Sequence, residues 1–94
     1  MDLRWARSAT KHRVAHGRSR FVVEHCGLRF EQPPPAGAPA GADVRLLYLG
    51  DDANGVALEV MAIELDDNSL LVIHAMPLRE RYQPQYEEAK RWRR

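Results

Sequence analysis

Two short clusters of basic and titratable side chains carry the chemistry that this sequence offers. The first is Lys11-His12-Arg13, and the second joins His74 to Arg79, Arg81 and Tyr82. Cleavage of RNA without a metal needs a base for the 2′-hydroxyl proton, an acid for the leaving oxygen and positive charge on the phosphate. Histidine serves either proton role near neutrality, arginine binds phosphate with two donors, and tyrosine stacks on a base or shares a proton. The candidate catalytic residues are therefore Lys11, His12, His74, Arg79, Arg81 and Tyr82.

Both clusters also have an ordinary structural interpretation. A histidine inside an apolar strand is more often a hydrogen-bonded core residue than a catalyst, and this applies to His74. Arg79 and Arg81, with Glu80 between them, form the kind of charge run that is usually solvated. The residues alone leave the catalytic and the structural interpretation open.

Motifs for cofactors and metals are missing from the sequence. It contains no P-loop, no dinucleotide-binding glycine pattern, no cysteine pair and no HExxH sequence. His12 and His16 lie four residues apart, which is only a weak signal for zinc. The single cysteine, Cys26, cannot form an internal disulfide and fits a buried place in a reducing compartment. We therefore expect neither a metal nor a cofactor.

Length and composition indicate one soluble domain over residues 1–94. The chain is 45% hydrophobic and 29% charged, which is typical of globular proteins. No apolar run approaches the ~20 residues that cross a bilayer, and the N-terminus lacks the apolar core of a secretory signal. These features predict a cytoplasmic protein without membrane contact.

Charge is segregated along the chain although the net charge is only +1. Residues 1–30 carry seven basic and two acidic residues, and residues 77–94 carry six basic and three acidic residues. Between them, residues 31–76 carry Arg45 and eight acidic residues. The two basic ends can face one polyanion, or they can meet the acidic middle across the fold. In the first case Arg45 should not contribute to binding.

The elements that must position the candidate residues follow from periodicity and turn signals. Ser8 predicts the N-cap of a short helix over 9–14, and Ser19 that of a second helix ending before Gly27. Strands are expected at 44–50, 56–65 and 70–76, because each is apolar and two polar turns, at 51–55 and 66–69, separate them. Such strands form an antiparallel meander.

Four further segments complete the predicted order. Short strands are expected at 3–5 and 28–31, and the Pro/Ala/Gly-rich stretch at 32–42 predicts a flexible surface loop. Pro84 suits the first turn of a last helix that buries Tyr86, Ala89 and Trp92. The sequence predicts an α+β fold: N-terminal helices, a meander of at least three strands and a C-terminal helix.

The order of these segments resembles the BrnT-like toxins of the RelE/ParE superfamily. The resemblance rests on Trp5, on Lys11-His12-Arg13-Val14, on a late strand Val72-Ile73-His74-Ala75-Met76, and on Arg79-Glu80-Arg81-Tyr82 followed by Tyr86-Glu87-Glu88. It covers nearly the whole chain except the proline loop. The family usually has Gly where Arg13 stands and Arg where Met76 stands, so Arg79 or Arg81 would supply the missing charge.

The resemblance implies a biological role. A toxin of this kind belongs to a type II toxin–antitoxin pair, cleaves RNA to stop translation, and is held inactive by a DNA-binding antitoxin. The expected partners are therefore RNA and a cognate antitoxin protein. Lys11, Arg79 and Arg81 would contact phosphate, His12 or His74 would carry protons, and Tyr82 would pack on a base or orient the nucleophile. The alternative is a non-catalytic module that binds protein or RNA on the same scaffold.

Overall fold

Five strands form one mixed sheet in the order β1-β5-β4-β3-β2. A computed structural model describes residues 2–34, 36–39 and 43–92. The strands are β1 (Leu3–Trp5), β2 (Arg29–Gln32), β3 (Arg45–Asp51), β4 (Ala57–Glu64) and β5 (Leu70–Pro77). β1 pairs with β5 in parallel, and the other neighbours are antiparallel. The three longest predicted strands are thus confirmed as β3, β4 and β5.

Short polar turns set the register of β3, β4 and β5. In the first turn the Asp52 carboxylate accepts hydrogen bonds from the backbone N–H groups of Asn54 and Val56, both at 2.9 Å. Gly55 takes φ +80° there, a left-handed conformation that glycine adopts without a side-chain clash. In the second turn Asn68 takes φ +67°. Asparagine tolerates this region better than most residues, so both turns are encoded locally.

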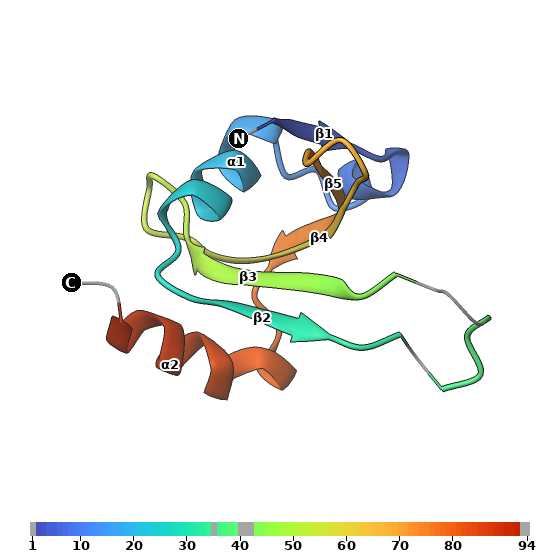
Figure 1. Ribbon diagram of the computed structural model, residues 1–94. Helices are drawn as coiled ribbons and strands as arrows, with labels where there is room; N and C mark the ends of the chain where they lie inside the picture. The colour runs from blue at the N-terminus through green and yellow to red at the C-terminus, as the bar shows by residue number, and fades with distance from the viewer. Residues whose placement is uncertain (1, 35, 40–42, 93–94) are drawn as a thin grey trace.

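Two helices cover opposite faces of the sheet. α1 (His16–His25) lies on one face and α2 (Gln83–Trp92) on the other (Figure 1). Two short 3-10 turns, η1 (Arg7–Thr10) and η2 (Glu80–Tyr82), precede the helices. The layers confirm the predicted α+β class.

The N-terminal helices differ from the prediction. The helix expected over 9–14 is only the turn η1, and α1 begins at His16 rather than after Ser19. Both serines that were expected to cap helices are bound elsewhere. The Ser8 hydroxyl donates to the Ile73 carbonyl at 2.7 Å, and Ser19 Oγ accepts from Trp5 Nε1 at 2.9 Å. Both hydroxyls therefore bind residues that are distant in the sequence and do not cap a helix.

Each face of the sheet has its own hydrophobic core. The α1 face buries Val22 and Val23 of the helix against strand residues that include Leu58, Val60 and Val72. The α2 face buries a smaller set, which comprises Leu47, Leu49, Met61, Tyr82 and Tyr86. The Tyr86 hydroxyl also donates to Asp51 Oδ1 at 2.6 Å, which fixes α2 on β3.

Two details at the edges of the fold also differ from the prediction. Trp92, expected in the buried stripe of α2, is 67% exposed, whereas Tyr86 and Ala89 are buried as expected. Of the loop predicted at 32–42, Gln32 is the last residue of β2, and residues 35 and 40–42 lie outside the described residues.

Candidate functional site

A one-residue bulge in β5 decides which face His74 occupies. Met61 of β4 pairs with His74 and Ala62 pairs with Val72, so Ile73 is an extra residue without a partner in β4. Side chains alternate faces along a strand, and an inserted residue shifts that alternation by one. Val72 and Ala75, three residues apart, accordingly both lie in the α1 core. His74 is thereby turned to the α2 face.

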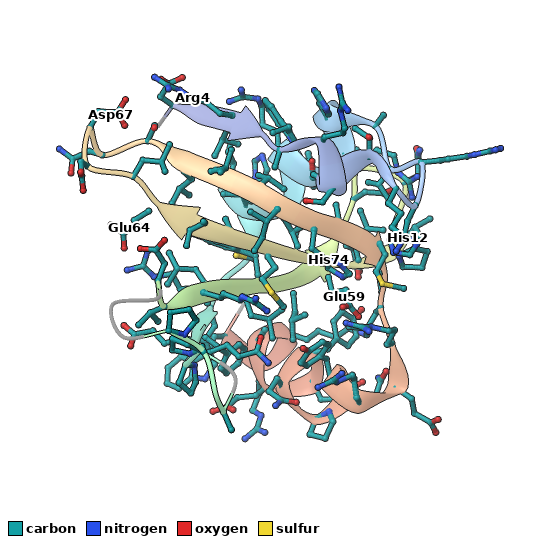
Figure 2. All side chains as sticks on the ribbon, turned by 90° about the vertical axis from the view of Figure 1, so that its right-hand side faces the viewer. Arg4, His12, Glu59, Glu64, Asp67 and His74 are labelled. Atoms are coloured by element: carbon teal, nitrogen blue, oxygen red, sulfur yellow. The ribbon has the colours of Figure 1, made fainter. Side chains whose placement is uncertain are left out.

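On that face His74 contacts a buried carboxylate. Glu59 lies in β4 with a side-chain exposure of 0%, and its Oε2 is 3.0 Å from His74 Nε2. Its neighbours in the strand, Leu58 and Val60, are core residues of the opposite face. Figure 2 shows His74 and Glu59 next to each other, with His12 approaching on the same side. A carboxylate buried in this way requires partners, because unpaired burial of a charge is costly.

Arg79 provides most of the hydrogen bonds to Glu59. Its backbone N–H donates to Oε1 at 2.8 Å, its Nε lies 3.1 and 3.0 Å from the two carboxylate oxygens, and its Nη2 donates to Oε2 at 2.7 Å. The Arg79 side chain remains 38% exposed. The pair therefore links the segment after β5 to the middle of β4 and leaves the guanidinium at the surface.

The charges in this cluster follow from burial and hydrogen bonding. Burial alone would raise the pKa of Glu59, but the hydrogen bonds from Arg79 and His74 outweigh it and hold the pKa below its ordinary value. Burial lowers the pKa of His74, against an opposing effect of Glu59. At neutral pH the site thus holds an ionised Glu59 and a neutral His74.

The hydrogen bond also selects the tautomer of His74. An ionised carboxylate only accepts hydrogen bonds, so the proton of the neutral ring is assigned to Nε2, which faces Glu59. Nδ1 then carries a lone pair and is free to accept a proton. A histidine oriented by a carboxylate in this way is a suitable general base.

An open pocket of about 570 Å³ lies beside His74 on the α2 face. It is bordered by strands β2 to β5 and by the segment through η2. Its lining combines three arginines, other polar side chains, two apolar residues of the sheet and one proline: Ser8, Gln32, Pro33, Arg45, Met61, Ile73, His74, Arg79, Arg81 and Tyr82.

Two of the three arginines in the pocket can bind an anionic ligand, because no acidic side chain among the described residues neutralises them. Arg81 lies over the Tyr82 ring at 5.0 Å from its centre, and Arg45 stands opposite Gln32 in the β2–β3 ladder. Within the described part of the chain, neither Arg45 nor Arg81 forms an ion pair. Arg79, in contrast, is paired with Glu59. The pocket is therefore electropositive and suited to an anion.

Tyr82 contributes its hydroxyl rather than its ring. The side chain is 5% exposed and belongs to the core of the α2 face. Its hydroxyl accepts a hydrogen bond from Gln32 Nε2 at 3.2 Å. A covered ring cannot stack on a base, so the hydroxyl is the part of Tyr82 that can act in the pocket.

The N-terminal candidates lie at the margin of this site. The His12 and His74 rings meet edge to face with their centres 5.7 Å apart. The segment is held on β5 by the Ser8–Ile73 bond and by Ala6 N–H, which donates to the Val72 carbonyl at 2.8 Å. Lys11 is exposed, and its side chain forms no hydrogen bond or ion pair with any described residue.

The pocket thus gathers His74, Arg79, Arg81 and Tyr82, touches His12 through His74 and does not include Lys11. Glu59, which holds His74 and Arg79, and Arg45, which lines the pocket, were not predicted as site residues from the sequence. Glu59 was signalled only by its place as a lone acid between apolar neighbours. Arg45, expected to stand apart from the site, lines the pocket because it pairs with Gln32 at the open end of β3.

No group of three or more His, Cys, Asp or Glu side chains in the described ranges is arranged to hold a metal ion. Nor does any described helix combine the length and apolar character needed to cross a membrane.

Comparisons with known proteins give no relative for this chain. No family model matches the sequence, no curated protein matches it, and no solved structure matches it.

Proposed function

We propose that this chain is a metal-independent endoribonuclease and the toxin of a type II toxin–antitoxin pair, with its active site in the pocket beside His74. The observation that carries the proposal is the cluster of Glu59, His74 and two unpaired arginines. A neutral histidine held by a buried carboxylate faces a pocket whose Arg45 and Arg81 suit phosphate.

The reaction follows from the placement of these groups. His74 Nδ1 accepts the proton of the ribose 2′-hydroxyl, and the resulting oxygen attacks the adjacent phosphorus. The bond from phosphorus to the 5′-oxygen breaks, which leaves a 2′,3′-cyclic phosphate and a 5′-hydroxyl. His12, at the edge of the His74 ring, donates the proton that this leaving oxygen takes up. Arg45 and Arg81 stabilise the charge that builds up on the phosphate oxygens.

The backbone at Arg13 supports the resemblance to BrnT-like toxins. Arg13 has φ +60°, a left-handed conformation that glycine adopts far more readily than arginine. The family usually has glycine at this position, so the local geometry suits the residue that the family uses. Arg81 lies in the pocket and is the residue that takes over the charge expected at the position of Met76.

A non-catalytic RNA-binding module on the same scaffold is the second candidate. One observation favours it: the Nε and Nη2 groups of Arg79 donate to Glu59, so these donors do not bind a phosphate. His12 also lies outside the lining of the pocket, so an acid for the leaving group would have to come from the margin.

Cleavage of a short single-stranded RNA in the presence of EDTA separates the two candidates. The wild-type protein should release products with a cyclic phosphate, and His74→Gln should lower the rate by about 10²–10⁴-fold. His25→Gln is the matched control, because His25 is an exposed histidine of α1 that stacks on Phe21. RNA binding without cleavage by folded wild-type protein would favour the module.

The cellular role needs its own test. Expression of the chain alone should arrest growth, and co-expression of the neighbouring gene product should relieve the arrest. Growth that continues at full rate, with soluble protein present, contradicts the toxin proposal.

A further inference from the structure

A second hollow of about 400 Å³ adjoins the catalytic pocket. Ile63 and Ile73 of the sheet form its floor, and Pro34 and Pro39 of the β2–β3 connection form its wall. Arg45 and Ile73 border both hollows, so a ligand can extend from one into the other. A group that occupies this hollow beside a bound phosphate meets mainly apolar side chains.

Two charged side chains stand at the rim of this hollow. Asp43 and Arg45 both line it: Arg45 is the first residue of β3, and Asp43 lies two residues before it. Asp43 is exposed, and no described residue hydrogen-bonds or ion-pairs with its carboxylate. One carboxylate that only accepts and one guanidinium that only donates therefore face a ligand between apolar walls.

We propose that this hollow binds the guanine base of the nucleotide next to the scissile phosphate, an inference that rests on the proposed function for the phosphate position. Guanine presents two neighbouring donors, N1–H and the N2 amino group, and two neighbouring acceptors, O6 and N7. The donors match the two oxygens of Asp43, and the acceptors match two of the five N–H donors of Arg45, whose other donors and positive charge remain for the phosphate. Adenine, cytosine and uracil lack a pair of donor atoms side by side, so none of them fills both carboxylate oxygens.

Binding of the four nucleoside 3′-monophosphates, measured by calorimetry on the whole protein, tests the proposal. Guanosine 3′-monophosphate should bind at least about tenfold more tightly than the other three. Asp43→Asn should remove that preference and leave the affinity for inorganic phosphate unchanged. Asp66→Asn is the control, because Asp66 is an exposed acid in the turn between β4 and β5. Unchanged melting temperatures verify that both variants fold.

The outcomes separate this inference from the proposed function. Equal affinities for the four nucleotides, or a guanine preference that survives in Asp43→Asn, overturn the guanine site even when phosphate binds and RNA is cleaved. A guanine preference lost in Asp43→Asn supports the site even when no cleavage is found, and only the ribonuclease then fails. Absence of binding by both phosphate and nucleotides overturns both.

Discussion

At the scale of single residues, Glu59 orients the ring of His74 through a hydrogen bond with its Nε2. Its buried charge is stable only because Arg79 and His74 donate to it. In turn it fixes which nitrogen of His74 carries a proton. A buried ion pair of this kind seldom adds stability over an apolar core, so under the proposed function its contribution is to orient the histidine.

The pH dependence of cleavage should report the state of His74. Its folded pKa lies below the reference value of 6.5, and the base acts only when neutral. The rate should therefore rise as the pH increases through the folded pKa of His74. A profile that falls over this range contradicts a role for His74 as the base. Single-turnover rates at several pH values, with His74→Gln as the reference, provide the measurement.

The same shift predicts a loss of stability in mild acid. Because the folded pKa of His74 is lowered, the unfolded chain binds more protons between the folded pKa and 6.5. The free energy of unfolding should decrease as the pH falls below about 6.5. It should decrease again as Glu59 and Asp52 take up protons below their ordinary pKa values of 4.5 and 3.8. Urea titrations of the wild type and His74→Gln should differ in the first window, because only the wild type carries the imidazole that takes up this proton.

Removal of Arg79 should damage the fold as well as the site. Arg79→Ala leaves the Glu59 carboxylate buried without its main partner, and we expect a loss of about 2–4 kcal/mol in the free energy of unfolding. The pKa of His74 should rise, because the positive charge that lowers it is gone. Arg91→Ala, an exposed change in α2, is the control. A loss within 0.5 kcal/mol of the control would mean that the pair is only a surface contact.

The place of Glu59 in the site could not be predicted from the sequence, whereas that of several neighbouring residues could. The candidates His74, Arg79, Arg81 and Tyr82 share one short stretch of sequence, and proximity along the chain brought them to one pocket. Glu59 lies 20 residues before Arg79 in the sequence. Their contact forms only because the segment after β5 folds back against β4. No local sequence pattern predicts the path of this segment.

At the scale of elements, local turn chemistry predicted the strands, and tertiary contacts overrode the prediction for the helices. The turns at 51–55 and 66–69 rely on Asp, Asn and Gly acting on their own backbone, which the sequence displays directly. The bulge at Ile73 produces no signal in the sequence. Leu70–Ile73 is apolar on both faces, so there is no alternation of polar and apolar residues that a bulge could interrupt. The orientation of His74 was therefore not predictable.

The backbone at Arg13 supports a prediction at this scale. Arg13→Gly should raise the free energy of unfolding by about 1 kcal/mol, because it relieves a left-handed arginine at φ +60°. Arg13→Ala is the matched control, because it removes the same side chain but keeps a Cβ atom. Equal gains in both variants would assign the effect to the side chain rather than to the backbone. Chemical denaturation of the three proteins measures the difference.

At the scale of the whole molecule, the segregated charges meet in part across the fold. Arg4 pairs with Asp67 at 2.9 Å, and Arg18 pairs with Asp52 at 2.8 Å, so two basic residues of the N-terminal third are matched by acids of the middle. Figure 2 shows Arg4 and Asp67 together at one end of the molecule, away from His74. Arg45 and Arg81 line the pocket without an acidic partner among the described residues, so a basic residue of the acidic middle joins the cations that a polyanion can meet.

This distribution predicts which arginines set the salt dependence of RNA binding. Each phosphate neutralised on a single strand contributes about −0.7 to the slope of log affinity against log salt. Arg81→Ala and Arg45→Ala should each flatten the slope by about that amount, because both line the pocket without an acidic partner among the described residues. Arg4→Ala should leave the slope unchanged, since Asp67 already neutralises Arg4. Fluorescence anisotropy at several salt concentrations measures the slopes. A slope that responds to Arg4 but not to Arg81 or Arg45 would move the RNA to the β1 end of the sheet and leave the His74 pocket without its anion.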